Sequence, residues 1–329
     1  MARRFRSPPP LAATLAAVTL PLALAAPLGA QGDDVQPFVT RELNALQART
    51  ALFALHLPSG RTAELRADVP MNTLSVIKIP VMILAFRDAE AGRLRLDARY
   101  TIRPEDLRRG SGLLQTFDAG LAPTYRDLVE QMIITSDNTA TDIMIRTLGL
   151  ARVNAMLADL GFRETRLNRT TGDLFREVWI RADARHAGMT DREVYERGFP
   201  NDAQASARSF ALEGDSTRWL GRTTAREMAT MLRGILEAKY ASKASSDAMV
   251  GILRRQFYAS RLPQRLSGRA SVAHKTGDWP PIAGNDVGIL FYPGGPSIVS
   301  VFTNQNTGDF FELEAILGRI AARVVEGWR

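Results

Sequence analysis

Apolar residues are most concentrated directly after Ser75, where residues 76–86 are apolar or proline at every position except Lys78. A stretch that is apolar on all faces predicts a helix buried in the middle of a domain. Ser75 would lie near the start of this helix, where unpaired backbone N–H groups and the helix dipole favour negative charge. The pattern therefore predicts a buried helix from Ser75 to Arg87.

Lys78 lies one turn into this predicted helix, on the same face as Ser75. A serine at a helix start with an amine beside it is an arrangement that activates a weak nucleophile. Burial also lowers the pKa of a lysine, which allows the side chain to act as a base. The alternative is an N-capping serine followed by a lysine that reaches out of a core helix, and this pattern alone favours that structural interpretation.

Strand patterns occur near both ends of the chain. Two short runs, residues 51–57 and 61–65, flank a Pro-Ser-Gly turn and predict a β-hairpin. Three further strands are expected at residues 271–275, 286–292 and 297–303, the last two joined by Pro-Gly-Gly-Pro. Because one hairpin is too small to be stable alone, we expect it to join the later strands in a single antiparallel sheet.

Helical patterns flank the strands and fill the middle of the chain. They cover residues 38–49, 125–135, 139–148, 151–160, 223–238, 246–255 and 311–325. The predicted fold class is α/β, with two lobes in a single domain over residues 31–329. Residues 36–68 and 223–329 would form a sheet lobe with flanking helices, and residues 69–222 an all-helical lobe. A cleft between the lobes is the natural place for a ligand site.

The least regular pattern covers residues 170–222. This segment contains too many aromatic residues for a disordered linker, namely Phe175, Trp179, Tyr195, Phe199, Phe210 and Trp219. Thr190 and Glu193 have the spacing of a capping box for a short helix. We predict an ordered, extended loop that lies over the cleft, and a peripheral decoration is an equally supported alternative.

The first thirty residues differ from the rest. Three arginines within the first six residues precede an apolar run over residues 11–28, which small residues close. This pattern predicts a secretory signal peptide, residues 1–30, rather than a transmembrane anchor. Cleavage is expected after Ala30, with Ala25 as the alternative. The predicted location is periplasmic or secreted, without a stable membrane anchor.

The formal charge of +7 does not indicate a nucleic-acid partner. Removing the predicted signal takes away three arginines and no acid, so +7 less three leaves +4. The remaining arginines are interspersed with acidic residues, without a basic block or stripe. The histidines His56, His186 and His274 lack metal-ligand spacing, and the chain contains no cysteine. We predict no metal or other cofactor, and a monomer that binds a small molecule.

Three short motifs with reactive or polar side chains follow one another along the chain. They are Ser75-x-x-Lys78, Ser136-Asp137-Asn138 and Lys275-Thr276-Gly277. Each is weak alone, but this triplet in this order is a signature of serine enzymes that react with β-lactams. The sequence resembles the class A β-lactamase family along most of the mature chain, from the first hairpin to the last helix.

The resemblance implies catalytic roles for three residues. Ser75 would attack a carbonyl carbon and form an acyl-enzyme. Lys78 would take or relay the hydroxyl proton, and Ser136 would pass a proton to the departing amide nitrogen. Backbone N–H groups of Ser75 and Asp278 would form the oxyanion hole.

The resemblance also implies a binding role for the other motif residues. The Asn138 amide would hold the acylamino group of the substrate. Lys275 and Thr276, on a strand edge, would bind its carboxylate, and Gly277 would let the substrate backbone approach closely. The implied substrate is a β-lactam.

The chain departs from the family where class A enzymes carry a glutamate that activates the deacylating water. Aligning residues 165–169 with the family's Thr-Arg-Leu-Asp-Arg phrase puts Thr171 where this glutamate belongs. Aligning Glu164 and Asn168 with the family's Glu-x-x-x-Asn spacing breaks that phrase. We favour the first register because it matches more residues.

In the favoured register, the nearest carboxylates that could replace the glutamate are Asp173 and Glu177. A second departure concerns the substrate carboxylate, because many family members add an arginine on or after the strand that follows Lys-Thr-Gly. No arginine occurs between Lys275 and Arg319. Any such contribution is expected from elsewhere in the chain.

Three functions remain open at this stage. The first is an exported serine β-lactamase that acts through a Ser75 acyl-enzyme. The second is a D-Ala-D-Ala peptidase or an esterase of the same fold, with slow or no β-lactam turnover. The third is a non-catalytic binding protein, which the intact Ser75, Lys78, Ser136 and Lys275 argue against.

Overall fold

The computed structural model of the chain describes residues 35–329. The predicted signal peptide and both candidate cleavage positions lie outside the described residues. The described part contains both helices and an antiparallel sheet, so the α/β prediction is confirmed. Within residues 35–329, no helix is both long enough and apolar enough to cross a membrane.

The main sheet has five antiparallel strands in the order β2-β1-β8-β7-β6. They are β1 (Arg49–His56), β2 (Thr62–Leu65), β6 (Ser271–Trp279), β7 (Ala283–Phe291) and β8 (Ser297–Asn304). The amino-terminal hairpin thus joins the carboxy-terminal strands, as predicted, through β1 and β8. Strand β6 extends four residues past its predicted end. These four added residues pair with β7 although two of them, Gly277 and Asp278, are of types that are rare in strands, so tertiary pairing overrides propensity.

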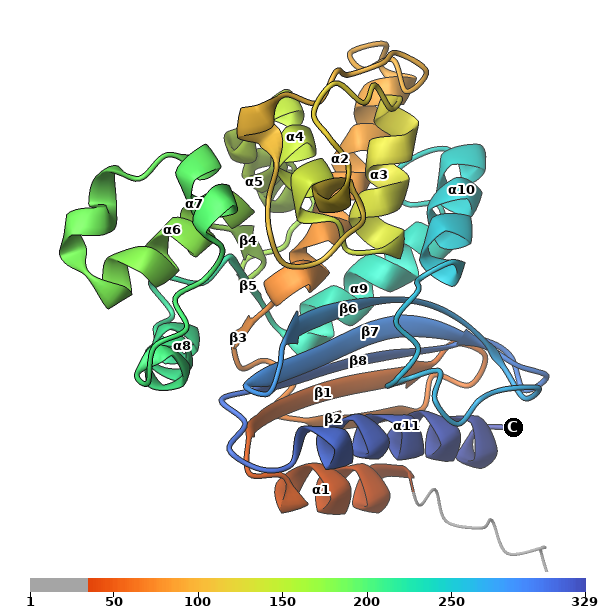
Figure 1. Cartoon of the computed structure of the whole chain (residues 1–329). Coiled ribbons are helices and arrows are strands. Elements are labelled where there is room, and N and C mark those ends of the chain that lie inside the picture. The colour runs from red at the N-terminus through yellow and green to blue at the C-terminus, as the bar shows by residue number, and fades with distance from the viewer. Residues whose placement is uncertain (1–34) are drawn as a thin grey trace, which may run out of the picture. The chain divides into compact units, whose positions relative to one another are not determined.

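Helices cover both faces of this sheet (Figure 1). Leu52 and Ala54 of β1 belong to a core formed with α1 (Val35–Ala45) and α11 (Phe310–Gly327). The alternate residues Ala51 and Phe53 belong to the larger core on the other face. This alternation is the two-residue period of a strand buried on both sides.

The helical part surrounds α2 (Lys78–Glu90), which is buried at ten positions. Its neighbours are α3 (Tyr125–Ile134), α4 (Asn138–Leu148), α5 (Leu150–Asp159) and α10 (Lys243–Arg254). The buried helix is confirmed, but it begins at Lys78 rather than at Ser75. This start puts Pro80 in the first helical turn, where a missing N–H costs no intrahelical bond.

Helices α9 (Ala225–Leu236) and α10 lie between the main sheet and the helical part around α2. Helix α9 contacts β1, β7 and β8, whereas α10 contacts β6 as well as α2 and α3. A second, small sheet, β3-β5-β4, was not predicted from the sequence. Its strands, β3 (Met71–Asn72), β4 (Arg166–Leu167) and β5 (Gly221–Thr223), are too short to produce a recognisable pattern.

The aromatic segment after residue 170 is ordered and mostly helical. It contains α6 (Thr171–Ala182), a 3₁₀ turn (Ala184–Gly188), α7 (Asp191–Arg197) and α8 (Ala205–Gly214). The predicted capping box at the start of α7 is present, formed by Thr190 and Glu193. Aromatic side chains fix the connections, since Phe175 packs edge-on against Phe199 with ring centroids 5.0 Å apart.

Candidate active site

Ser75 lies in the 3₁₀ turn Leu74–Ile77 that connects β3 to α2. Leu74 has a φ of +45°, a conformation that costs a non-glycine residue about 1 kcal/mol or more. A buried amide holds the chain just before the turn, because Asn285 Nδ2 donates to Asn72 O at 2.9 Å. Groups on β3 and β7 therefore maintain the strained backbone that presents Ser75.

Strand β6 passes very close to this turn. A Cβ atom on Gly277 would lie 2.5 Å from Thr73 O and 3.2 Å from Val76 Cγ2, so only glycine fits there. The resemblance implied that this glycine admits the substrate backbone. The structure shows a second reason for glycine, because a close approach also occurs inside the protein, between β6 and the Ser75 turn.

Lys78 is completely buried at the first position of α2. Its Nζ donates to Ser136 O at 2.7 Å, to Ser136 Oγ at 3.2 Å and to Asn138 Oδ1 at 2.9 Å. Burial, aided by the positive charge of Lys275, lowers the pKa of Lys78 well below its usual range. The alternative of a lysine that reaches out of the core is therefore wrong, and the side chain is suited to moving protons.

Lys275 on β6 contacts the same Ser136 hydroxyl. Its Nζ donates to Ser136 Oγ at 3.0 Å and to Thr276 O at 2.8 Å. Burial lowers the pKa of Lys275 to about 7. Two buried amines with lowered pKa values thus converge on one hydroxyl, which connects all three motifs in space.

The Ser136 loop is held rigidly in front of α4. Ser136 has a φ of +56°, and its carbonyl accepts a hydrogen bond from Ser111 Oγ at 2.7 Å. The Asp137 carboxylate caps α4 by accepting from Ala140 N at 2.8 Å, and it also accepts from Leu114 N at 2.7 Å. The loop therefore serves as a helix cap and also presents Ser136 to the two lysines.

Arg261 is a residue of this site that the sequence did not reveal. Its side chain is 2% exposed, forms an ion pair with Asp278 and lines the same cleft. Within residues 35–329, Arg261 Nη1 and the buried Thr276 Oγ1 have no hydrogen-bond partner. Both are unsatisfied buried polar atoms, and of these two residues only Arg261 lines the cleft.

The loop that carries Arg261 is anchored under the sheet. Leu262 N donates to Asp286 Oδ2 at 3.1 Å, and Asp286 Oδ1 is 2.9 Å from His274 Nδ1. An arginine thus lines the cleft from a loop before β6, whereas the family's arginine follows that strand. No local pattern marks Arg261, because the loop between α10 and β6 has neither a helical nor a strand period.

Thr171 begins α6 and lines the cleft, and in the favoured register it takes the place of the family's glutamate. Its Oγ1 donates to Asp142 Oδ1 at 2.7 Å, and its backbone N–H donates to the same oxygen at 2.8 Å. Asp142 also accepts from Gly172 N at 2.9 Å and from Arg108 Nε at 2.7 Å. A buried carboxylate therefore stands behind Thr171, fully engaged in holding the start of α6.

None of the three candidate carboxylates lines the cleft. Glu164 is 42% exposed and pairs with Arg222, and Asp173 is 46% exposed and caps α6. Glu177 is buried, but Arg218 Nη1 lies 3.3 Å from its Oε2. Their positions do not favour any of them as the base for a water beside Ser75.

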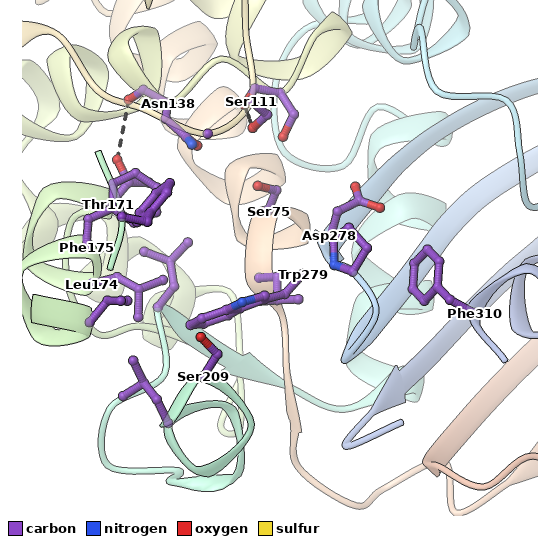
Figure 2. Close-up of a pocket in the computed structure, with 18 of the residues that line it drawn as sticks. Ser75, Ser111, Asn138, Thr171, Leu174, Phe175, Ser209, Asp278, Trp279 and Phe310 are labelled. Carbon is purple, nitrogen blue, oxygen red and sulfur yellow. Dashed lines mark hydrogen bonds between the residues drawn. The ribbon is translucent and has the colours of Figure 1, made fainter. Parts of the chain in front are cut away.

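A cleft of about 640 Å³ joins these elements. Figure 2 shows Ser75 between Asp278 on one side and Thr171 and Phe175 on the other. The wall facing β6 comes from α6, α8 and the connection between them. The segment after residue 170 is therefore part of the cleft wall, and its interpretation as a peripheral decoration is wrong.

Comparison with known proteins identifies the family. The chain matches the β-lactamase enzyme family over residues 35–328 and belongs to it. A β-lactamase from Streptomyces fradiae is 27% identical over 285 residues, which cover 84% of this chain and 80% of that protein. A β-lactamase from Streptomyces albus G is 32% identical over 133 residues, and the chain spans only 42% of its length.

Solved structures support the same fold. The crystal structure of a β-lactamase from Sphaerobacter thermophilus has a TM-score of 0.70 and 27% identity, covering 88% of this chain and 95% of that one. PBP-A has a TM-score of 0.70 at 23% identity, covering 89% of this chain and 95% of its own. A leucine-to-glutamate mutant of PBP-A, solved as an acyl-enzyme with penicillin G, is similar at a TM-score of 0.69 and 23% identity, over 89% of this chain and 94% of its own.

Proposed function

We propose that the protein is an exported, monomeric serine hydrolase that opens β-lactams by forming an acyl-enzyme on Ser75, and that it releases the product slowly. The observation that carries the proposal is the contact of two buried lysines with Ser136 beside the Ser75 turn. Lowered lysine pKa values provide both a base and a proton relay without a histidine. Membership of the β-lactamase family supports β-lactams as the substrate class.

Acylation would begin with the neutral Lys78 amine, which takes the proton from Ser75 Oγ as this oxygen bonds to the β-lactam carbonyl carbon. The carbonyl oxygen becomes an oxyanion, and backbone N–H groups of Ser75 and Asp278 would stabilise it. Strand β6 is the edge strand of the sheet, so alternate N–H groups point away from β7 and are free to do so.

Collapse of this intermediate would break the bond from carbon to nitrogen. Ser136 Oγ would donate its proton to the departing nitrogen and recover one from Lys78, whose Nζ lies 3.2 Å away. The substrate carboxylate would bind to Lys275, Thr276 and Arg261. Arg261 already forms an ion pair with Asp278, and the buried Thr276 hydroxyl has no hydrogen-bond partner within residues 35–329. Asn138 would hold the acylamino group.

Release of the acyl group requires an activated water. Thr171 has no basic group, and Asp142 behind it is occupied by four donors. Lys78 is then the remaining base near Ser75, and it already serves the acylation step. We therefore expect acylation to be faster than hydrolysis, so the acyl-enzyme should accumulate.

The first test follows the intact mass of the mature protein during incubation with penicillin G. An adduct of the drug's mass should appear quickly and then decay slowly, while hydrolysed drug accumulates at the same slow rate. Rapid drug hydrolysis without a detectable adduct would contradict slow release. Absence of both adduct and hydrolysis would contradict β-lactam acylation altogether.

Thr171 also favours a second candidate, a D-Ala-D-Ala peptidase or an esterase of the same fold. Such an enzyme has to release only the acyl group of its peptide or ester substrate. It therefore does not need a glutamate that hydrolyses a β-lactam adduct. Release of D-alanine from a peptide ending in D-Ala-D-Ala, faster than penicillin turnover, would favour the peptidase. If the protein neither releases D-alanine nor forms an adduct with any acyl donor, a non-catalytic binding protein is favoured.

The rate of acylation should follow a bell-shaped pH profile. Lys78 is a base only when deprotonated, so the rate should rise with pH through its lowered pKa. Lys275 binds a carboxylate only when protonated, so the rate should fall as pH rises through its pKa of about 7. The Lys275→Arg variant stays protonated and should move only the falling limb, to higher pH. The measurement is kcat/KM against pH, and an unmoved falling limb would contradict this role of Lys275.

A further inference from the structure

The cleft continues past Ser75 into a compartment that the segment after residue 170 builds. We call it the α8 compartment, and its lining residues are Leu174, Phe175, Val178, Phe199, Ser209 and Leu212. Leu174 and Leu212 are buried, whereas Val178 and Ser209 are partly exposed toward the cleft. In Figure 2, Leu174, Phe175 and Ser209 lie on the side of Ser75 away from Asp278.

Two short helices present matching faces to this compartment. On α6, Leu174 and Val178 are four residues apart, and on α8, Ser209 and Leu212 are three apart. These spacings put each pair on one side of its helix. The two helices contact each other, so their inward faces form a continuous wall.

The chemistry at Ser75 determines which part of a substrate faces this wall. Ser136 and Lys275 contact each other at the leaving-group end, where the departing nitrogen must be protonated. The acyl part stays on Ser75 and extends away from that end, toward Leu174 and Phe175. The α8 compartment therefore lies on the acyl side of the scissile bond.

The charged residues at the far end neutralise each other. Arg181 forms ion pairs with Asp215 and Glu177, and Arg208 forms one with Asp202. A compartment with apolar walls and compensated charges at its rim gains most from burying uncharged apolar surface. It gives no advantage to an acyl group that carries its own charge.

We propose that the α8 compartment is the acyl subsite and that it selects substrates whose acyl group carries a bulky, uncharged aryl or branched alkyl group. The proposal rests on the proposed acyl transfer to Ser75. Apolar contacts far from the reacting carbonyl raise the rate of acylation when they are made in the transition state.

The test compares penicillins that share one nucleus and differ only in the acyl group, from acetyl through phenylacetyl to naphthoyl. The second-order rate constant of acylation, from intact mass over time, should rise about tenfold or more along this series. Ser209→Trp should fill the compartment and remove most of this gain, so that the naphthoyl compound acylates the variant little faster than the acetyl compound does. Ser206→Trp is the matched control on the same helix, because Ser206 is exposed and does not line the cleft.

The outcomes separate the two proposals. If no penicillin acylates the wild-type protein, acyl transfer at Ser75 fails. If all penicillins acylate it at equal rates, or if Ser209→Trp behaves like Ser206→Trp, the acyl subsite is wrong although acyl transfer stands. Equal thermal unfolding of both variants and the wild type, measured by circular dichroism, shows that each is folded.

Discussion

Replacement of Ser75 with alanine should abolish covalent labelling by penicillin G. The Oγ atom is the group that bonds to the carbonyl carbon, and removal of a nucleophilic serine lowers the rate of a hydrolase by about 10⁶-fold. Lys78 cannot substitute, because its Nζ is buried and points to Ser136 and Asn138. No adduct should form during a period in which the wild-type protein is fully acylated.

The variant should keep its fold. Within residues 35–329, the Ser75 side chain has no hydrogen-bond partner, and the turn is held by backbone hydrogen bonds and by the Asn285 amide. We expect the free energy of unfolding to change by less than about 0.5 kcal/mol. Equal thermal unfolding of the variant and the wild type, measured by circular dichroism, checks this.

Ser111→Ala is the matched control for this experiment. Ser111 lines the same cleft, and its hydroxyl donates to Ser136 O, so its loss should slow labelling without preventing it. Peptide mapping of the wild-type adduct should locate the drug on Ser75. An adduct that forms on Ser75→Ala and maps to Ser136 would show that the nucleophile is misassigned.

Much of the architecture could be predicted because its signals are local. The buried helix, the hairpin and the helices around α4 follow from apolar period and turn residues within a few positions. Most of the helices in the segment after residue 170 could not be predicted in this way. The start of α6 depends on Asp142, which lies 29 residues before Thr171 and receives its hydrogen bonds. No window of adjacent residues contains that information.

The site residues also divide into those marked by a local motif and those placed only by long-range contacts. Ser75, Lys78 and Ser136 could be found because their motifs have fixed spacing, and the structure brings the side chains of the last two into contact. Arg261 could not, since only the folding of β6 and the preceding loop brings it to Asp278. The crowding of Gly277 by Thr73 O could not be predicted either, because that atom belongs to a distant part of the chain.

A glutamate at position 171 should convert slow release into faster turnover, provided that Asp142 is changed at the same time. We expect Thr171→Glu/Asp142→Asn to raise the rate of deacylation by about 10²-fold, the lower range for a positioned general base. Thr171 lines the cleft, so a longer side chain with a carboxylate there can reach a water beside the acyl-enzyme.

The second substitution is needed because of charge. Asp142 Oδ1 lies 2.7 Å from Thr171 Oγ1, so Thr171→Glu alone would put two carboxylates together in a buried place. One of them would then stay protonated and could not act as a base. With Asp142→Asn, the total charge near Arg108 is unchanged, and the new amide can donate a hydrogen bond to the glutamate. Arg108 also keeps its ion pair with Asp191.

The measurement is the decay of the penicillin G adduct by intact mass after free drug is removed, for the wild type, both single variants and the double variant. Thr171→Glu should release the adduct little faster than the wild type, and Asp142→Asn alone should not accelerate release, because neither provides an ionised base beside the water. Only the double variant should couple fast adduct loss to sustained penicillin hydrolysis. Fast release by the unmodified protein, or equal release by all four proteins, would show that the water is activated by a group other than one at position 171.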